Sequence, residues 1–386
     1  MLKLGIIGIG NMGSGHLQNV LNGLCPDIRI TALADRKESR RAFAKEKCPE
    51  AAIFTEGSDL IRSGACEAVL IATPHYQHPP LAQEAFAAGL HVMCEKPAGV
   101  YTLQVREMIA AADKRPDLVF GMMFNQRTNC VYRKMKEMID AGEIGTIKRM
   151  SWLVTDWYRT QYYYDSGAWR ATWAGEGGGV LLNQCPHQLD LLQWLCGLPS
   201  RVHAFCHEGK WHDVEVEDDV TAYLEFSNGA TGVFITTTSD CPGTNRLEID
   251  LDGGQLICDG KTLIKKKLAM DINEFHKTYK GGFGSPEVEV IEVETDGLNP
   301  QHMGVLQQFT DKILGRGELV AGGEEGINGL TISNAMHLSS WLDETITLPI
   351  DEDKFLEELN KRRATSRLKT GEGVTLDTEG TYGSKK

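Results

Sequence analysis

The first third of the chain alternates between short apolar runs and amphipathic segments. Each apolar run is nearly continuous, which is typical of strands buried on both faces of a sheet. The segments between them repeat their apolar residues every three or four positions, as surface helices do. We predict strands at 4–8, 28–35, 67–73, 91–95 and 118–124, and helices at 11–24, 38–45, 79–88 and 103–112. Repeated strand–helix units predict an α/β domain over residues 1–124, with a doubly wound parallel sheet.

The pattern changes after residue 124. The predicted elements are a helix at 129–141, a strand at 145–157, a helix at 181–196, several short strands, and helices at 300–314 and 324–344. Two-residue hairpin turns separate the short strands, at Asn228-Gly229, Asp252-Gly253 and Asp259-Gly260. We therefore expect an α+β domain over residues 125–365 with a large, mostly antiparallel open sheet. Residues 366–386, rich in Gly, Ser and Thr, are expected to form a polar tail or arm.

Composition narrows the class of protein. At 386 residues, the chain is longer than one hydrophobic core usually fills. Its net charge of −13 argues against a nucleic acid or an anionic membrane as partner, and no apolar run approaches 18 residues. The ten cysteines are scattered without a C-x-x-C pair, and no signal-peptide pattern precedes the first strand. We expect a cytoplasmic protein with reduced thiols.

A glycine motif lies at the first strand–helix junction. It reads Gly8-Ile9-Gly10-Asn11-Met12-Gly13, and Asp35 follows its last glycine by 22 positions. Such a loop lets a pyrophosphate approach the backbone at the start of a helix, where free N–H groups point at it. Asp35 can accept hydrogen bonds from both ribose hydroxyls, which favours NAD. Arg36 leaves NADP open, because an arginine there can bind the extra phosphate.

Two further segments carry a family resemblance. The first runs from Thr73-Pro74-His75-Tyr76-Gln77-His78 to Glu95-Lys96-Pro97, and the second is the stretch 177–192, a triple glycine followed by Asn183, His187 and Asp190. Together with the N-terminal glycines, these motifs resemble the Gfo/Idh/MocA family of glucose–fructose oxidoreductase and inositol dehydrogenase relatives. The resemblance extends from residue 1 to about residue 350.

The resemblance implies functions for particular residues. Lys96 and His187 would act on a substrate hydroxyl, His187 as general acid/base and Lys96 by stabilising the alkoxide. The position four residues before the histidine is usually aspartate in the family, but here it is Asn183, which cannot ionise. We add Asp190 as a residue that holds substrate or histidine. The expected cofactor-binding residues are Gly8, Gly10, Asn11, Met12, Gly13, Asp35, Arg36, Thr73, Pro74, His78, Glu95 and Lys96.

Helical spacing supports the second motif independently. At about 100° per residue, Asn183, His187 and Asp190 fall within an arc of about 60°, opposite a leucine-rich side. Such a stripe predicts a polar line facing a cleft. The alternative is a buried, hydrogen-bonded histidine held by Asp190.

An aromatic stretch precedes the triple glycine. Its rings offer flat apolar faces to the C–H surface of a sugar, and its polar groups can bind hydroxyls. The substrate residues predicted there and in the motifs are Lys96, Asp156, Tyr163, Trp169, Arg170, Trp173, Asn183 and His187. Some of these rings could instead belong to the core or to a subunit contact.

No metal site is predicted. His203, Cys206, His207 and His212 do not match a standard ligand spacing. The acidic run at 215–219 is expected to be a solvated turn entering a strand.

The sequence thus predicts an NAD(P)-dependent dehydrogenase acting on a ring hydroxyl of a sugar, glycoside or cyclitol. The resemblance implies a homodimer or homotetramer formed through the C-terminal sheet. Two alternatives remain: an NAD-dependent glycosidase that works by transient oxidation and elimination, and a non-catalytic NAD-binding regulator.

Overall fold

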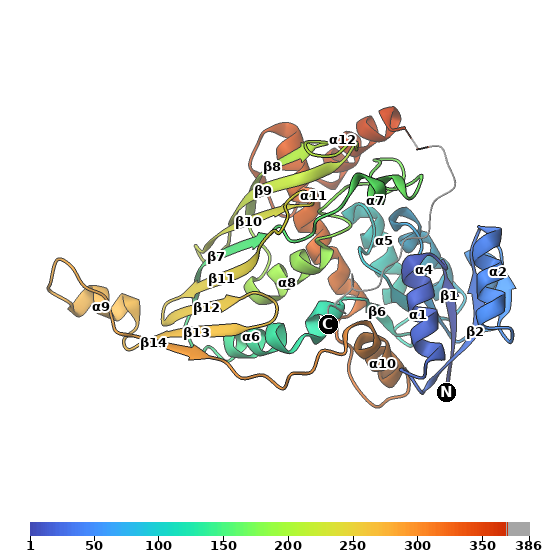
Figure 1. Cartoon of the computed structure of the whole chain (residues 1–386), viewed down its shortest axis with the longest axis horizontal. Helices are drawn as coiled ribbons and strands as arrows, with labels where there is room; N and C mark the ends of the chain where they lie inside the picture. The colour runs from blue at the N-terminus through green and yellow to red at the C-terminus, as the bar shows by residue number, and fades with distance from the viewer. Residues whose placement is uncertain (368, 370–386) are drawn as a thin grey trace.

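The computed structural model describes residues 1–367 and 369. It contains two sheets, with most of the helices between them or on the far side of the first sheet (Figure 1). The predicted tail at 366–386 therefore lies almost wholly outside the described residues. Within them, no helix is long and apolar enough to cross a membrane.

The first sheet is parallel, with strand order β3-β2-β1-β4-β5-β6. Its strands are β1 (Leu2–Ile7), β2 (Ile28–Ala34), β3 (Ala52–Phe54), β4 (Ala68–Ile71), β5 (His91–Cys94) and β6 (Phe120–Met122). Its helices are α1 (Asn11–Leu21), α2 (Glu38–Lys47), α3 (Gly57–Arg62), α4 (His78–Ala87) and α5 (Thr102–Asp113). This is the predicted doubly wound sheet, and its order reverses between β1 and β4.

The second sheet has nine strands in the order β14-β13-β12-β11-β7-β10-β9-β8-β15. These are β7 (Ile147–Val154), β8 (Arg201–Glu208), β9 (Glu217–Glu225), β10 (Thr231–Thr237), β11 (Asn245–Leu251), β12 (Gly254–Cys258), β13 (Leu263–Leu268), β14 (Val288–Glu292) and β15 (Ile346–Thr347). Only β7 and β10 pair in parallel, so the predicted mostly antiparallel sheet is confirmed. All three predicted hairpin turns join consecutive antiparallel strands.

Helices cover one face of this second sheet. They include α6 (Cys130–Asp140), α8 (Pro186–Cys196) and α11 (Gly326–Leu342), which lie between the sheet and the first domain (Figure 1). The remaining helices are α7 (Gln161–Asp165), α9 (Ile272–Thr278), α10 (Gln301–Ile313) and α12 (Glu352–Thr365). The leucines of α8 are buried in the same core as Trp152 of β7. Helix α10 packs on the first sheet, because Val305, Leu306 and Phe309 join its core.

Two local expectations differ from the structure. Helix α8 begins at Pro186, not at residue 181, because residues 177–185 form turns and proline is favoured in the first turn of a helix. The acidic run at 215–219 is not a solvated turn, since Glu217 and Asp218 are buried. The Glu217 carboxylate accepts hydrogen bonds from the N–H groups of Gly179 (2.9 Å) and Leu181 (3.0 Å), and so holds the loop that carries Asn183.

Candidate active site

The glycine loop has the shape of a nucleotide cradle. Gly8 has φ = +93°, and a Cβ there would lie 2.6 Å from the carbonyl oxygen of Ala72. A Cβ on Gly13 would lie 1.8 Å from the carbonyl oxygen of Gly8. The close packing of α1 on the loop after β1 therefore requires glycine at position 13. A Cβ on Gly10 would meet no atom within 4 Å. The chain itself therefore gives no reason for glycine at position 10, whereas a bound pyrophosphate does.

The Gly10→Ala variant tests this cradle. We expect its melting temperature to match that of the wild type, because φ is −71° and the space is open. We expect its Kd for NADH to rise about tenfold or more, because the added methyl group occupies the phosphate position. Titration of the purified protein with NADH, followed by nucleotide fluorescence, measures the change.

The matched control is Gly15→Ala, an exposed helical position that is also open. It should bind NADH normally. Equal affinities of the two variants would contradict the cradle.

Asp35 lies beside the glycine loop, with two arginines nearby in the sequence. The Asp35 carboxylate accepts hydrogen bonds from the N–H groups of Ile9 (2.7 Å) and Lys37 (2.8 Å), which fix it beside the glycine loop. Arg36 is directed away, to Glu56 (2.9 Å). Arg40, which the sequence did not suggest, donates to the carbonyl oxygen of Ile9 (2.6 Å).

The segment after β4 lies against the glycine loop. The imidazole of His78 lies between two backbone oxygens, 2.7 Å from that of Thr73 and 2.7 Å from that of Pro97. Burial lowers the pKa of His78, while the two backbone oxygens act in the opposite direction. His78 therefore braces the Glu95-Lys96-Pro97 motif against the residues around Pro74. Its role here is to position the chain.

Lys96 lies at the carboxyl end of β5 and reaches the second domain. Its Nζ donates a 2.9 Å hydrogen bond to the backbone oxygen of Asn183. Burial lowers the pKa of Lys96, and the neighbouring Arg159 acts in the same direction, while Glu95 opposes them. The carboxyl edge of a parallel sheet is where open α/β folds bind ligands.

Two groups hold the side chain of Asn183. Its Nδ2 donates to Glu176, and the Tyr163 hydroxyl donates to its Oδ1 (3.3 Å). Arg170 in turn donates to the Tyr163 oxygen (2.6 Å). Burial raises the pKa of Glu176, and the nearby Arg170 partly offsets this.

His187 stands in the first turn of α8, edge-on to Phe124, with ring centroids 6.5 Å apart. Burial, followed by the charge of Lys96, holds the pKa of His187 well below its ordinary value. The ring is therefore neutral near pH 7 and can accept a proton. Its Nδ1 is buried and has no hydrogen-bond partner among the described residues.

Asp190 does not hold His187. Both of its carboxylate oxygens bind Arg127, at 2.8 and 2.6 Å, and the side chain is buried. Arg127 also reaches Glu325 (2.7 Å). The prediction that Asp190 contacts substrate or histidine is wrong, because a buried arginine that the sequence did not reveal takes the carboxylate.

The Asp190→Ala variant distinguishes a structural role, as partner of Arg127, from a catalytic role. It leaves the Arg127 charge buried with only Glu325 as partner, which should lower the free energy of unfolding by about 3 kcal/mol. The residual activity of the folded fraction should remain near that of the wild type. Urea unfolding with parallel kinetics measures both quantities. A large loss of kcat at unchanged stability would restore a catalytic role.

A second buried polar contact lies close to Lys96. His16 Nε2 and Glu95 Oε1 are 2.6 Å apart, and His302 meets His16 edge-on, with ring centroids 5.5 Å apart. Burial alone would raise the pKa of Glu95, but the contact with His16, together with His302 and Lys96, brings it down to about 2. His302, whose pKa burial lowers to about 4, was not found from the sequence, since it comes from distant α10.

The aromatic stretch divides between site and core. Tyr163 contacts Asn183, and Arg170 lies over both Tyr163 (4.3 Å) and Trp169 (4.8 Å). Asp156 is exposed just beyond β7. Trp173 is buried against His337 and Trp341, as in the alternative that some of these rings belong to the core.

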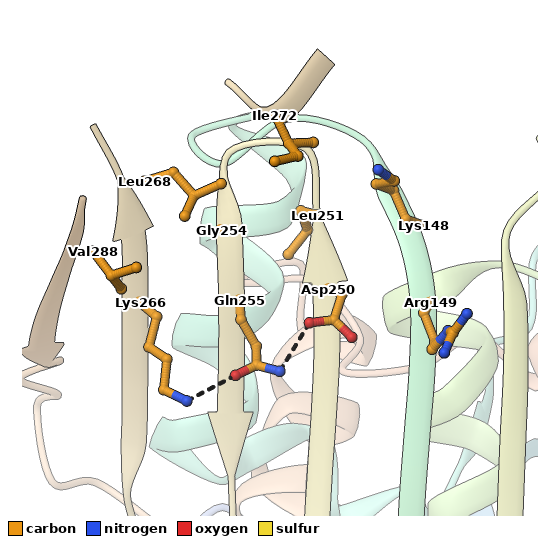
Figure 2. Close-up of a pocket in the computed structure, with 10 residues that line it drawn as sticks. All are labelled: Lys148, Arg149, Asp250, Leu251, Gly254, Gln255, Lys266, Leu268, Ile272 and Val288. Carbon is orange, nitrogen blue, oxygen red and sulfur yellow. Dashed lines mark hydrogen bonds between the residues drawn. The ribbon is translucent and has the colours of Figure 1, made fainter. Parts of the chain in front are cut away.

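A groove of about 460 Å³ lies on the face of the nine-stranded sheet that the helices do not cover. Figure 2 shows Lys148, Arg149, Asp250, Gln255 and Lys266 along it, with the helices behind the sheet. It is separate from the motif residues. No group of three or more His, Cys, Asp or Glu in the described ranges is arranged to hold a metal ion.

Comparison with known proteins agrees with both domains. Residues 2–122 match the family model described as "Oxidoreductase family, NAD-binding Rossmann fold", and residues 132–257 match the GFO/IDH/MocA C-terminal domain. The chain belongs to the Gfo/Idh/MocA oxidoreductase family. Its first domain is thus an NAD-binding Rossmann domain, as predicted.

Individual Gfo/Idh/MocA relatives are distant. Inositol 2-dehydrogenase from Corynebacterium glutamicum is 29% identical over 204 residues, which cover 52% of this chain and 55% of that protein. Myo-inositol 2-dehydrogenase from Thermotoga maritima is 26% identical over 266 residues, which cover 67% and 75%. The chain thus matches about half the length of the first of these relatives.

A solved Gfo/Idh/MocA structure covers more of the chain. The WlbA dehydrogenase from Bordetella pertussis, in complex with NADH and UDP-GlcNAcA, superposes with a TM-score of 0.77 at 25% identity. The match covers 91% of this chain and 98% of that one. The two-domain fold therefore agrees with that of a solved NADH complex.

Proposed function

We propose that the protein is an NAD(P)-dependent dehydrogenase that oxidises a ring hydroxyl of a sugar, glycoside or cyclitol. The observation that carries this proposal is the meeting of Lys96 with the Asn183 segment, at 2.9 Å, beside a neutral, buried His187. All three come from the two motifs of the family and meet at the edge of the Rossmann sheet. The substrates named for the inositol dehydrogenases and WlbA support the substrate class.

Lys96 and His187 have different roles toward the substrate hydroxyl. His187 takes the hydroxyl proton as general base, and its lowered pKa keeps the ring in the form that accepts it. The Lys96 ammonium stabilises the negative charge that develops on the substrate oxygen. NAD⁺, when bound in the glycine cradle, supplies the hydride acceptor. In the reverse direction His187 returns the proton to the reduced carbonyl.

Asn183 has a positioning role in this scheme. It cannot ionise, and its amide is held by Glu176 and Tyr163. It orients the hydroxyl while His187 moves the proton.

NAD is the proposed nucleotide, with NADP as the second possibility. Asp35 is fixed where a ribose hydroxyl would bind and would repel a 2′-phosphate. Arg36 does not counter it, because Glu56 takes its guanidinium.

We also propose a homodimer or homotetramer formed through the nine-stranded sheet, in a cytoplasmic protein. Large apolar side chains are exposed on several strands of that sheet: Phe205 on β8, Tyr223 on the adjacent β9, Leu153 on β7 and Val290 on the edge strand β14. Exposed apolar residues gathered on one face are typical of a subunit contact.

A product-resolved screen tests the reaction. The protein is incubated with sugars, alkyl and aryl glucosides and inositols, with NAD or NADP, while nicotinamide reduction and aglycone release are followed together. Reduction that depends on one substrate group supports the dehydrogenase. Aglycone release without net reduction would instead identify an NAD-dependent glycosidase. Nucleotide binding with neither signal would identify a regulator.

A further inference from the structure

An uncompensated cation lies next to the proposed reaction centre. Arg159 follows β7, and its guanidinium carbon lies 5.5 Å from the ring centroid of Trp157 and 5.2 Å from that of Tyr163. Its Nη1 donates to the carbonyl oxygen of Tyr158 (2.8 Å), and its backbone N–H to Thr238 (2.8 Å). No carboxylate of the described residues forms an ion pair with it. Arg159 is near enough to Lys96 for its charge to lower the pKa of that lysine.

The acidic groups of the site are already engaged. Glu95 pairs with His16 at 2.6 Å. Glu176 binds Asn183 and lies 4.0 Å from Arg170. Neither of these carboxylates pairs with Arg159, which is partly exposed and can be reached by a ligand. A guanidinium that lies over aromatic rings is preorganised and weakly hydrated, which suits it to bind an anion through two parallel hydrogen bonds.

We propose that Arg159 binds an anionic group on the substrate, so that the enzyme acts on a sugar bearing a carboxylate or a phosphate. This inference rests on the proposed function, because it names the substrate class of the same site. Tyr163 links the two regions: Arg159 stacks near its ring, and its hydroxyl contacts Asn183. An anion held by Arg159 would thereby fix the sugar ring relative to Lys96 and His187. Arg159 acts here as a specificity-determining residue.

The test compares matched neutral and charged sugars. Glucose, glucuronate and glucose 6-phosphate form one set, and galactose with galacturonate forms a second. Nicotinamide reduction gives kcat/KM for each, and calorimetry with NADH present gives the affinity for each without turnover. The variants are Arg159→Gln, which removes the charge, and Arg159→Lys, which keeps it without the planar fork. Arg29→Gln removes an exposed arginine of β2 and serves as the control.

We expect the wild type to prefer an anionic member of a set over its neutral partner. Arg159→Gln should lower that preference about tenfold or more, Arg159→Lys should lower it less, and Arg29→Gln should leave it unchanged. Preference for the uronates identifies a carboxylate, and preference for glucose 6-phosphate identifies a phosphate.

The outcomes separate this inference from the proposed function. Turnover of neutral sugars without an anion preference overturns the role of Arg159 and leaves the dehydrogenase standing. Arg159-dependent binding of an anionic sugar without nicotinamide reduction supports Arg159 and counts against the dehydrogenase. Failure of every anionic sugar to bind overturns the inference.

Discussion

His187→Ala is expected to lower kcat for hydroxyl oxidation by about 10²- to 10⁴-fold while NADH binding stays intact. The variant removes an imidazole in the first turn of α8, close enough to Lys96 to feel its charge, and leaves the residues of the glycine loop unchanged. The nucleotide Kd should therefore not change. Steady-state kinetics and a fluorescence titration with NADH measure the two quantities.

The pH dependence of the same reaction gives a second readout. Burial lowers the pKa of His187, so the acid limb of kcat/KM should lie below pH 6.5, the ordinary pKa of the group. In His187→Ala this limb should disappear from the residual rate. The control is His207→Ala, an exposed histidine of β8, which should keep both rate and profile. An unchanged acid limb in His187→Ala would assign the proton to another group.

The elements of the fold that the sequence predicted are those with a local signal. Continuous apolar runs marked most strands of the parallel sheet, and Asn-Gly and Asp-Gly pairs marked three hairpins of the second. The predicted helix begins too early, at residue 181 inside the 177–185 loop, because Leu181 and Leu182 have helical spacing with the leucines of α8. The turns of this loop are set by contacts from elsewhere, above all by Glu217 of β9, which binds two of its N–H groups.

The residues of the site likewise differ in whether a local sequence motif marks them. Lys96, Asn183 and His187 stand in motifs, and the structure brings them together. Arg127, His302 and Arg159 have no motif of their own, since tertiary packing alone places them near these residues. Asp190 was assigned to the wrong partner for the same reason, because helical spacing shows which residues share a face but not which group faces them.

Lys96→Met is expected to lower kcat strongly and to raise the melting temperature. The ammonium stabilises charge on the substrate oxygen, and its removal should cost about 10² to 10³ in kcat. The same ammonium is buried, and burial lowers the pKa of Lys96 in the folded protein. Folding therefore works against its charge, and an apolar side chain of similar length should relieve that cost.

The sign of this stability effect depends on pH in a defined way. A lysine whose pKa is lowered on folding destabilises the native state at any pH below its pKa in the unfolded chain, because protonating it is less favourable in the folded protein. The advantage of Lys96→Met should thus be largest at neutral and lower pH and should shrink as the pH rises toward 10.5, the ordinary lysine pKa. Thermal unfolding across this range, beside kinetics at each pH, measures both effects. Lys114→Met, at an exposed position in the Rossmann domain, should change neither. If Lys96→Met lost stability and activity together, the lysine would be a structural bridge to Asn183, and the stabilisation of the alkoxide would have to come from another group.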